Sequence, residues 1–126
     1  MATVDLYNNL SAVTTLAPAA RTAAATGAAA DLQGYEGAMI QAVVGTITDG
    51  THTLTVEESA DGTTWTAVAA ANLQGSFNAL ATNTNQKAGY LGAKRYLRVN
   101  TGITGATTGG VYAVAVVRGN PRKAPV

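Results

Sequence analysis

Residues 54–68, LTVEESADGTTWTAV, constrain the fold more than any other stretch because they predict two strands folded back on each other. The first residues alternate apolar and polar side chains, and a period of two is typical of a half-buried strand. Asp61 and Gly62 accept the positive φ angles that a tight turn needs, and a second run of the same kind begins at Trp65. The stretch predicts a β-hairpin, and nothing in it indicates chemistry.

The composition favours β structure in the rest of the chain. A chain of 126 residues that is 47% hydrophobic suits one domain with a real core. Its fourteen glycines and many threonines indicate strands joined by turns. We expect an all-β fold, either an antiparallel β-sandwich or a small, jelly-roll-like barrel. Much of the apolar content is alanine, so the core is thin or is completed by a partner.

Two further runs, residues 38–47 and 111–118, are apolar on both faces, as interior strands of a sandwich are. The turn at Asp49-Gly50 joins the first run to the hairpin, which predicts an antiparallel meander of three strands. A strand is also expected over residues 90–100, where Leu97 and Val99 face one way and Tyr96 and Arg98 the other.

Polar, glycine-rich segments separate these strands. Residues 71–89 predict a long loop with a short strand around residues 77–80, and residues 102–110 predict a second loop. The closing GNPRKAPV contains two prolines, which are excluded from central strands, so the chain is expected to leave the sheet at about Gly119.

Residues 1–30 differ from the rest and predict an extended N-terminal arm, which leaves residues 31–126 as the sandwich domain with a short proline-containing tail. The segment LAPAARTAAATGAAADL is rich in alanine, but Pro18 and Gly27 interrupt it and no apolar stripe recurs at helical spacing. A helix from about Ala17 to Ala25 is the alternative. If residues 1–30 are an arm, the domain should fold without them.

Charge and cysteine content argue against several classes of partner. Charged residues make up 12% of the chain and the net charge is +1, so we expect no binding to nucleic acid or to an anionic membrane. Without cysteine there is no disulfide and no thiolate metal site. The N-terminus has neither the basic start nor the apolar run of a secretory signal, and no window is long and apolar enough to span a membrane.

The chain's few ionisable side chains do not predict catalysis. His52 is the only histidine, and it is expected to be an exposed turn residue rather than a base or a metal ligand. Glu57 and Glu58 are adjacent on a strand, so they point to opposite faces. Asp49 and Asp61 lack the ligand spacing of a calcium site.

The glycine-rich run at residues 104–110 lacks the pattern of a phosphate-binding loop. We therefore expect no catalytic residue, metal or cofactor, and no enzymatic activity.

Six of the eight positive charges fall between Lys94 and Lys123, close in sequence to several tyrosines. Such a set can bind nucleic acid or glycan, but arginine and tyrosine also anchor protein interfaces, and we favour a protein interface. Trp65 is expected to fill the core, with sugar stacking as the alternative. The candidate interface residues are Tyr7, Arg21, Tyr96, Arg98, Arg118, Arg122 and Lys123.

Four segments carry a resemblance to a known group of proteins. These are DLQGYEGA (31–38), VEESADGTTWTAV (56–68), YLGAKRYLRV (90–99) and GGVYAVAVVRGNPRKAPV (109–126). Their pattern and order resemble small structural proteins of tailed bacteriophages, found among head genes. The most distinctive part is the pairing of S-x-D-G-x-T-W with a later K-R-Y-L-R-V.

The resemblance implies a virion component, assembled in the host cytoplasm, that acts as a capsid decoration (cement) protein. Its implied partners are the major capsid protein or other virion subunits, together with copies of itself. The arm, from Thr3 to Ala30, would then lie across a neighbouring subunit. A neck or tail component and a carbohydrate- or cell-surface-binding module are the alternatives.

Overall fold

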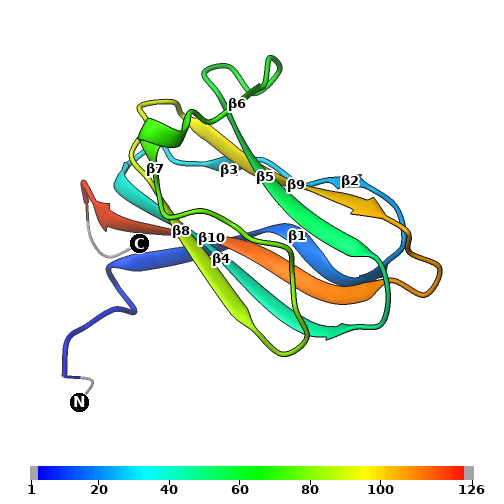
Figure 1. Cartoon of the computed structure of the whole chain (residues 1–126). Helices are drawn as coiled ribbons and strands as arrows, with labels where there is room; N and C mark the ends of the chain where they lie inside the picture. The colour runs from blue at the N-terminus through cyan, green and yellow to red at the C-terminus, as the bar shows by residue number, and fades with distance from the viewer. Residues whose placement is uncertain (1–2, 124–126) are drawn as a thin grey trace.

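Two antiparallel sheets pack face to face as a β-sandwich in the computed structural model, which describes residues 3–123 (Figure 1). In order across the sheet, sheet A contains β1 (Leu10–Arg21), β10 (Gly110–Pro121), β4 (Tyr35–Ile47), β8 (Asn85–Tyr90) and β7 (Leu73–Gln74). Sheet B contains β2 (Ala25–Thr26), β9 (Tyr96–Thr104), β5 (Thr51–Ser59) and β6 (Thr66–Ala67), and β3 (Ala30–Asp31) also pairs with β9. The predicted all-β sandwich is confirmed.

Helical structure is limited to one short turn in the described residues, η1 (Ala70–Asn72), which lies just before β7. Consequently, no helix among residues 3–123 has the length and apolar character to cross a membrane.

The core is built from alternate residues of the long strands. On β9, Leu97 and Val99 are fully buried whereas Tyr96 and Arg98 are partly exposed, so the predicted facing of this strand is confirmed. The same alternation on β4 and β10 places every second residue between the sheets. The main core cluster consists of Leu16, Ala30, Ile40, Ala42, Val56, Tyr90, Leu97, Val99, Val114 and Val116.

Residues 10–30, expected to be part of an arm outside the domain, lie within the sandwich. β1 pairs antiparallel with β10 from Leu10↔Gly119 to Arg21↔Gly110, with two register shifts on the way. β2 and β3 then cross to sheet B and pair with β9. Ala17 and Arg21 belong to β1, so the alternative helix does not form. The segment is extended as predicted, but its partners are strands of the same chain, and only residues 3–9 of the described arm precede the first strand. Residues 1–2 lie outside the described residues.

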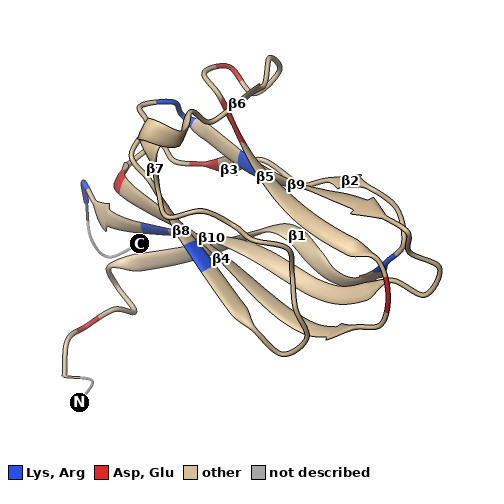
Figure 2. Cartoon of the chain, in the orientation of Figure 1, with Lys and Arg blue, Asp and Glu red and all other residues tan. Residues whose placement is uncertain are grey.

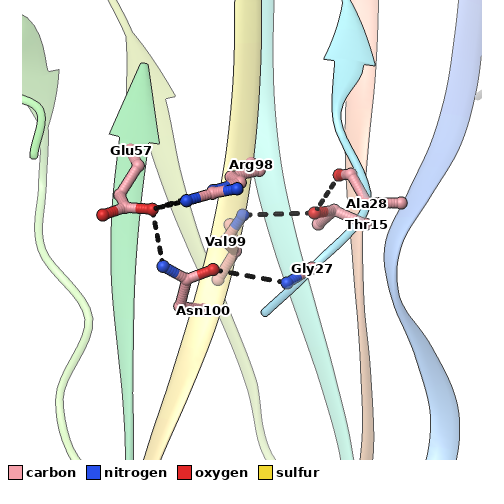
Figure 3. Close-up of polar contacts among 7 residues, drawn as sticks. All are labelled: Thr15, Gly27, Ala28, Glu57, Arg98, Val99 and Asn100. Carbon is pink, nitrogen blue, oxygen red and sulfur yellow. Dashed lines mark hydrogen bonds and ion pairs between the residues drawn. The ribbon is translucent and has the colours of Figure 1, made fainter. Parts of the chain in front are cut away.

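A buried threonine ties β1 to sheet B at one of these register shifts (Figure 3). The hydroxyl of Thr15 donates to the carbonyl of Ala28 at 2.7 Å and accepts from the backbone N–H of Val99 at 3.1 Å. The N–H of Gly27 donates to the carbonyl of Val99 at 3.0 Å. Thr15 and Gly27 therefore satisfy both backbone groups of Val99 at the position on β9 that lies between β2 and β3.

The predicted three-strand meander is wrong, because β4 and β5 belong to different sheets. The chain turns at Asp49 and Gly50 as predicted, but the turn carries it from sheet A to sheet B. Local turn chemistry cannot distinguish these two outcomes, since a turn sets the chain reversal and not the identity of the paired strand. The hairpin is confirmed, with Glu57↔Ala67 and Glu58↔Thr66 as its paired residues.

Three other boundaries differ from the prediction. The short strand of the 71–89 region is β7, and residues 77–80 form no strand. The strand expected over residues 90–100 begins at Tyr96 as β9, and residues 85–90, all but the last of which were expected in the loop, form β8 in the other sheet. β10 continues past Gly119 to Pro121, which pairs with Tyr35 at the end of the sheet, where a missing N–H is tolerated. Residues 124–126 of the predicted tail lie outside the described residues.

Candidate protein interface

Arg98 forms part of a polar cluster on the outer face of sheet B (Figure 3). Its Nε donates to Glu57 Oε1 at 2.8 Å, and the same oxygen accepts from the side-chain amide of Asn100 at 2.6 Å. The guanidinium also lies over the ring of Trp65, 4.2 Å from its centroid. Arg98 is therefore engaged on both sides within its own chain.

Trp65 does not fill the core, contrary to the prediction. It is partly exposed, outside both core clusters, and stacked under Arg98. A ring covered by a guanidinium is a poor platform for a sugar. Thr66 pairs with Glu58, whose side chain points toward sheet A, so alternation places the preceding Trp65 on the outer side with Glu57 and Arg98.

Other predicted interface residues also have partners inside the chain. Arg118 donates to the carbonyl of Asp31 at 2.9 Å and to the hydroxyl of Ser11 at 2.6 Å. Arg122 forms an exposed ion pair with Glu36. Tyr96 lies under the guanidinium of Arg95, 4.9 Å from its centroid, and Arg95 in turn pairs with Asp31 at 2.9 Å.

The structure does not bring the seven candidate residues together. Arg21 and Arg118 lie at opposite ends of the β1–β10 pairing, where Arg21 is opposite Gly110 and Arg118 is opposite Ser11. Tyr7 lies before β1 and is 87% exposed, and Lys123 is exposed near the other end of the chain. The cationic residues among them therefore do not form one basic face, as the distribution of Lys and Arg in Figure 2 also shows.

His52 is fully buried, so the prediction of an exposed turn residue is wrong. Its Nε2 lies 3.0 Å from the carbonyl oxygen of Asp49, and its Nδ1 lies 3.1 Å from the hydroxyl of Tyr112. A carbonyl only accepts, so Nε2 donates to Asp49, and in the tautomer with its proton on Nε2 the Nδ1 atom accepts from Tyr112. The Tyr112 hydroxyl oxygen also lies 2.6 Å from the hydroxyl of Thr101. The network links the two sheets, and burial raises the pKa of Tyr112.

Replacing Tyr112 with phenylalanine is expected to lower the free energy of unfolding by about 1–3 kcal/mol, because it leaves a buried nitrogen of His52 without its donor. Tyr96→Phe is the matched control, since within the described residues the Tyr96 hydroxyl has no hydrogen-bond partner. Its effect should stay below about 0.5 kcal/mol. Urea denaturation measures both, and equal effects of the two variants would contradict a structural role for the network.

Glu57 and Glu58 point to opposite faces, as predicted. Glu57 binds Arg98 on the outer face, whereas Glu58 accepts a hydrogen bond from the hydroxyl of Tyr90 in sheet A. Burial, reinforced by this carboxylate, raises the pKa of Tyr90 to about 12. The two carboxylates thus serve separate structural contacts.

The carboxylates of the turn residues Asp49 and Asp61 accept hydrogen bonds from backbone N–H groups of loops. Asp49 accepts hydrogen bonds from the backbone N–H groups of Thr107, Thr108 and Gly109, and these bonds lower its pKa to about 2. The glycine-rich loop therefore directs its amides at an internal carboxylate. Asp61 similarly binds the N–H groups of Thr63 and Thr64, which lowers its pKa. Within residues 3–123, no three His, Asp or Glu side chains are close enough together to hold a metal ion.

Comparison of the chain with protein-family models, curated proteins and solved structures found no match. Its possible partners must therefore be inferred from its own surfaces.

The segment before β1 presents apolar side chains outside the sandwich. Val4, Leu6 and Tyr7 are 78%, 57% and 87% exposed, and Figure 1 shows this segment projecting away from the two sheets. A local turn shapes it, in which the carboxylate of Asp5 accepts from the backbone N–H of Asn8 at 3.1 Å. Of these three exposed residues, only Tyr7 is among the interface residues predicted from the sequence.

A second apolar surface is the outer face of sheet A. The residues that alternate with the buried positions of β1, β10, β4 and β8 point away from sheet B. We call this set the outer A face. It consists of Leu10, Ala12, Thr14, Val111, Ala113, Ala115, Val117, Gly119, Gly37, Met39, Gln41, Val43, Gly45, Asn85, Lys87 and Gly89. The sequence carried its signal, since residues 38–47 and 111–118 are apolar on both faces.

A hollow of about 420 Å³ lies at one end of the sandwich, between residues 32–38 and 90–95. Of the charged residues along it, Arg122 binds Glu36 and Arg95 binds Asp31, and Lys94 has no ion pair with any residue that the structure describes. A single such cation is not a cluster of charge for an ionic ligand.

Proposed function

We propose that this chain is a non-enzymatic structural protein of a virion, a capsid decoration protein that binds the head through protein–protein contacts. The observation that carries the proposal is the exposed apolar segment before β1, with Val4, Leu6 and Tyr7 outside the sandwich. The resemblance to small phage structural proteins supplies the location, and the major capsid protein or another virion subunit is the proposed partner. A neck or tail position is the alternative within the same class.

The segment is suited to binding a neighbouring subunit. Full burial of one large apolar side chain contributes about 1.5–3 kcal/mol, so three such residues can support a modest contact after the loss of chain entropy. Modest contacts become effective when a symmetric shell repeats them many times. No catalytic group is needed for this role.

The rival glycan-binding function gains no support from the surface around Trp65. The ring that would stack on a sugar already stacks under Arg98. Because Glu57 holds that guanidinium at 2.8 Å, exposing the ring would require breaking a partly buried ion pair.

The test is to purify the virus particles whose genome encodes this chain and to measure the copies of the chain per particle by quantitative mass spectrometry. Replacing Val4, Leu6 and Tyr7 together with serine is expected to reduce occupancy at least about tenfold, because the apolar contact is lost while the sandwich is untouched.

Leu91→Ser is the matched control, since Leu91 is also exposed, at 58%, but lies in the loop between β8 and β9. It should leave occupancy unchanged. Absence of the wild-type chain from purified particles would overturn the virion role, and normal occupancy of the triple variant would overturn the role of the segment.

A further inference from the structure

We propose that two copies of this chain associate face to face through the outer A face. This inference does not depend on the virion role, because it concerns copies of the chain in solution. One side of sheet A is buried against sheet B, whereas the other side, which is apolar along most of β10 and much of β4, is uncovered. Val43 is 54% exposed and Val111 is 45% exposed on neighbouring strands.

The outer A face is almost free of charge. Along β1, β10 and β4 the only charged residues are Arg21, Arg118 and Glu36, all near strand ends, and Figure 2 shows these strands uncharged between them. Lys87 on β8 is the only charged member of the face itself. A partner with a charged surface would find nothing to pair with here, whereas a second copy brings an equally neutral face.

The shape of the outer A face also suits packing against a second sheet. Ala113 and Ala115 lie in the middle of β10, whereas the middle of neighbouring β4 carries Met39, Gln41 and Val43 on the same face. Gly37 and Gly45 lie toward the two ends of β4, so small side chains on β10 lie beside larger ones on β4. Sheets pack about 10 Å apart when small and branched side chains interdigitate in this way.

The available area matches a dimer. Strands lie about 4.8 Å apart and rise about 3.3 Å per residue, so about ten residues each of β1, β10 and β4 and the six residues of β8 cover roughly 570 Å² per copy. The roughly 1,140 Å² from two copies is close to the lower end of specific interfaces. Polar residues on the flanking strands, Thr14 on β1 and Asn85 and Lys87 on β8, would form the rim. A reversible dimer with two-fold symmetry is the expected result.

The experiment is sedimentation velocity on the full chain from about 1 to 200 µM, the range in which an interface of this size associates. We expect wild-type protein to shift from monomer to dimer as concentration rises. Val43→Glu is expected to raise the dimer dissociation constant about tenfold or more, because it replaces an apolar contact with a charged side chain that loses its hydration in the interface. Val43→Ser is the milder second variant should the glutamate variant fail to fold.

Thr53→Glu is the matched control, since Thr53 is exposed on β5, on the outer face of sheet B. It adds the same charge and should leave the dimer intact, as should removal of residues 1–9. A wild-type chain that stays monomeric throughout would overturn the proposal. A dimer that survives both Val43 variants would also overturn the proposal and would point to edge pairing of β1. Loss of the dimer on removal of residues 1–9 would overturn it too, because it would assign the contact to that segment. Association in solution and particle occupancy are separate measurements, so either proposal can fail without the other.

Discussion

Replacing Gly27 with alanine is expected to lower the free energy of unfolding by about 3 kcal/mol or more, because the added methyl group meets atoms that cannot move away. It would lie 2.2 Å from the carbonyl oxygen of Val99 and 2.5 Å from Thr15 Oγ1. Both atoms are held by hydrogen bonds, the first from the N–H of Gly27 and the second to Ala28 and Val99. Relieving the clash would separate β1 from β9.

Gly102→Ala is the matched control for this prediction. Gly102 is also on a strand of sheet B, but the nearest atom to an added methyl group is Thr53 Oγ1 at 3.4 Å. Its effect should remain within about 1 kcal/mol, and urea or thermal denaturation measures both variants. Similar stability of the two variants would show that the close approach at Gly27 does not contribute to the fold.

Deleting residues 1–24 is expected to abolish cooperative unfolding altogether. The deletion removes β1, which covers the edge of β10 along most of its length and supplies the buried Thr15 and Leu16. The exposed backbone edge and the opened core would together exceed the roughly 5–15 kcal/mol by which domains are stable. Circular dichroism and denaturant titration check this result. It reverses the expectation, drawn from the sequence, that the domain folds without residues 1–30.

Two further variants make the deletion informative. Deleting only residues 1–9 should leave the unfolding transition within about 0.5 kcal/mol of wild type, since this segment contributes nothing to either core cluster. A synthetic peptide of residues 10–24, added to the chain that lacks residues 1–24, should restore folding by completing sheet A. A cooperatively folded chain without residues 1–24 would show that β1 is dispensable, as an arm would be.

The sequence predicts the wrong location for His52 and Trp65, and the reason is the same for both. His52 lies at a turn-to-strand junction, where exposure is the common outcome, but its partner Tyr112 lies sixty residues further along the chain. Trp65 follows a turn, where a large ring usually fills the core, but Arg98 on β9 covers it on the outer face. In both cases the deciding contact is distant in sequence, and local patterns carry no information about it.

The candidate interface shows the same limit. Residue type alone favours arginine and tyrosine at an interface, but Arg98, Arg118 and Arg122 bind residues of the same chain. The uncovered outer A face had a clear signal, since β4 and β10 are apolar on both sides. That pattern was interpreted as two buried faces, and only the number of layers in the structure shows that one of them is open.

The sequence by itself determined that this protein is all-β, where the hairpin turns and which residues of β9 face inward, because alternation and turn chemistry depend on backbone geometry within a few residues. Only the tertiary structure decided that residues 10–30 belong to the sandwich, that the chain changes sheets at Asp49-Gly50 and that sheet A has an uncovered face. Strand pairing and layer number arise from contacts between distant segments, and many pairings satisfy the same local pattern.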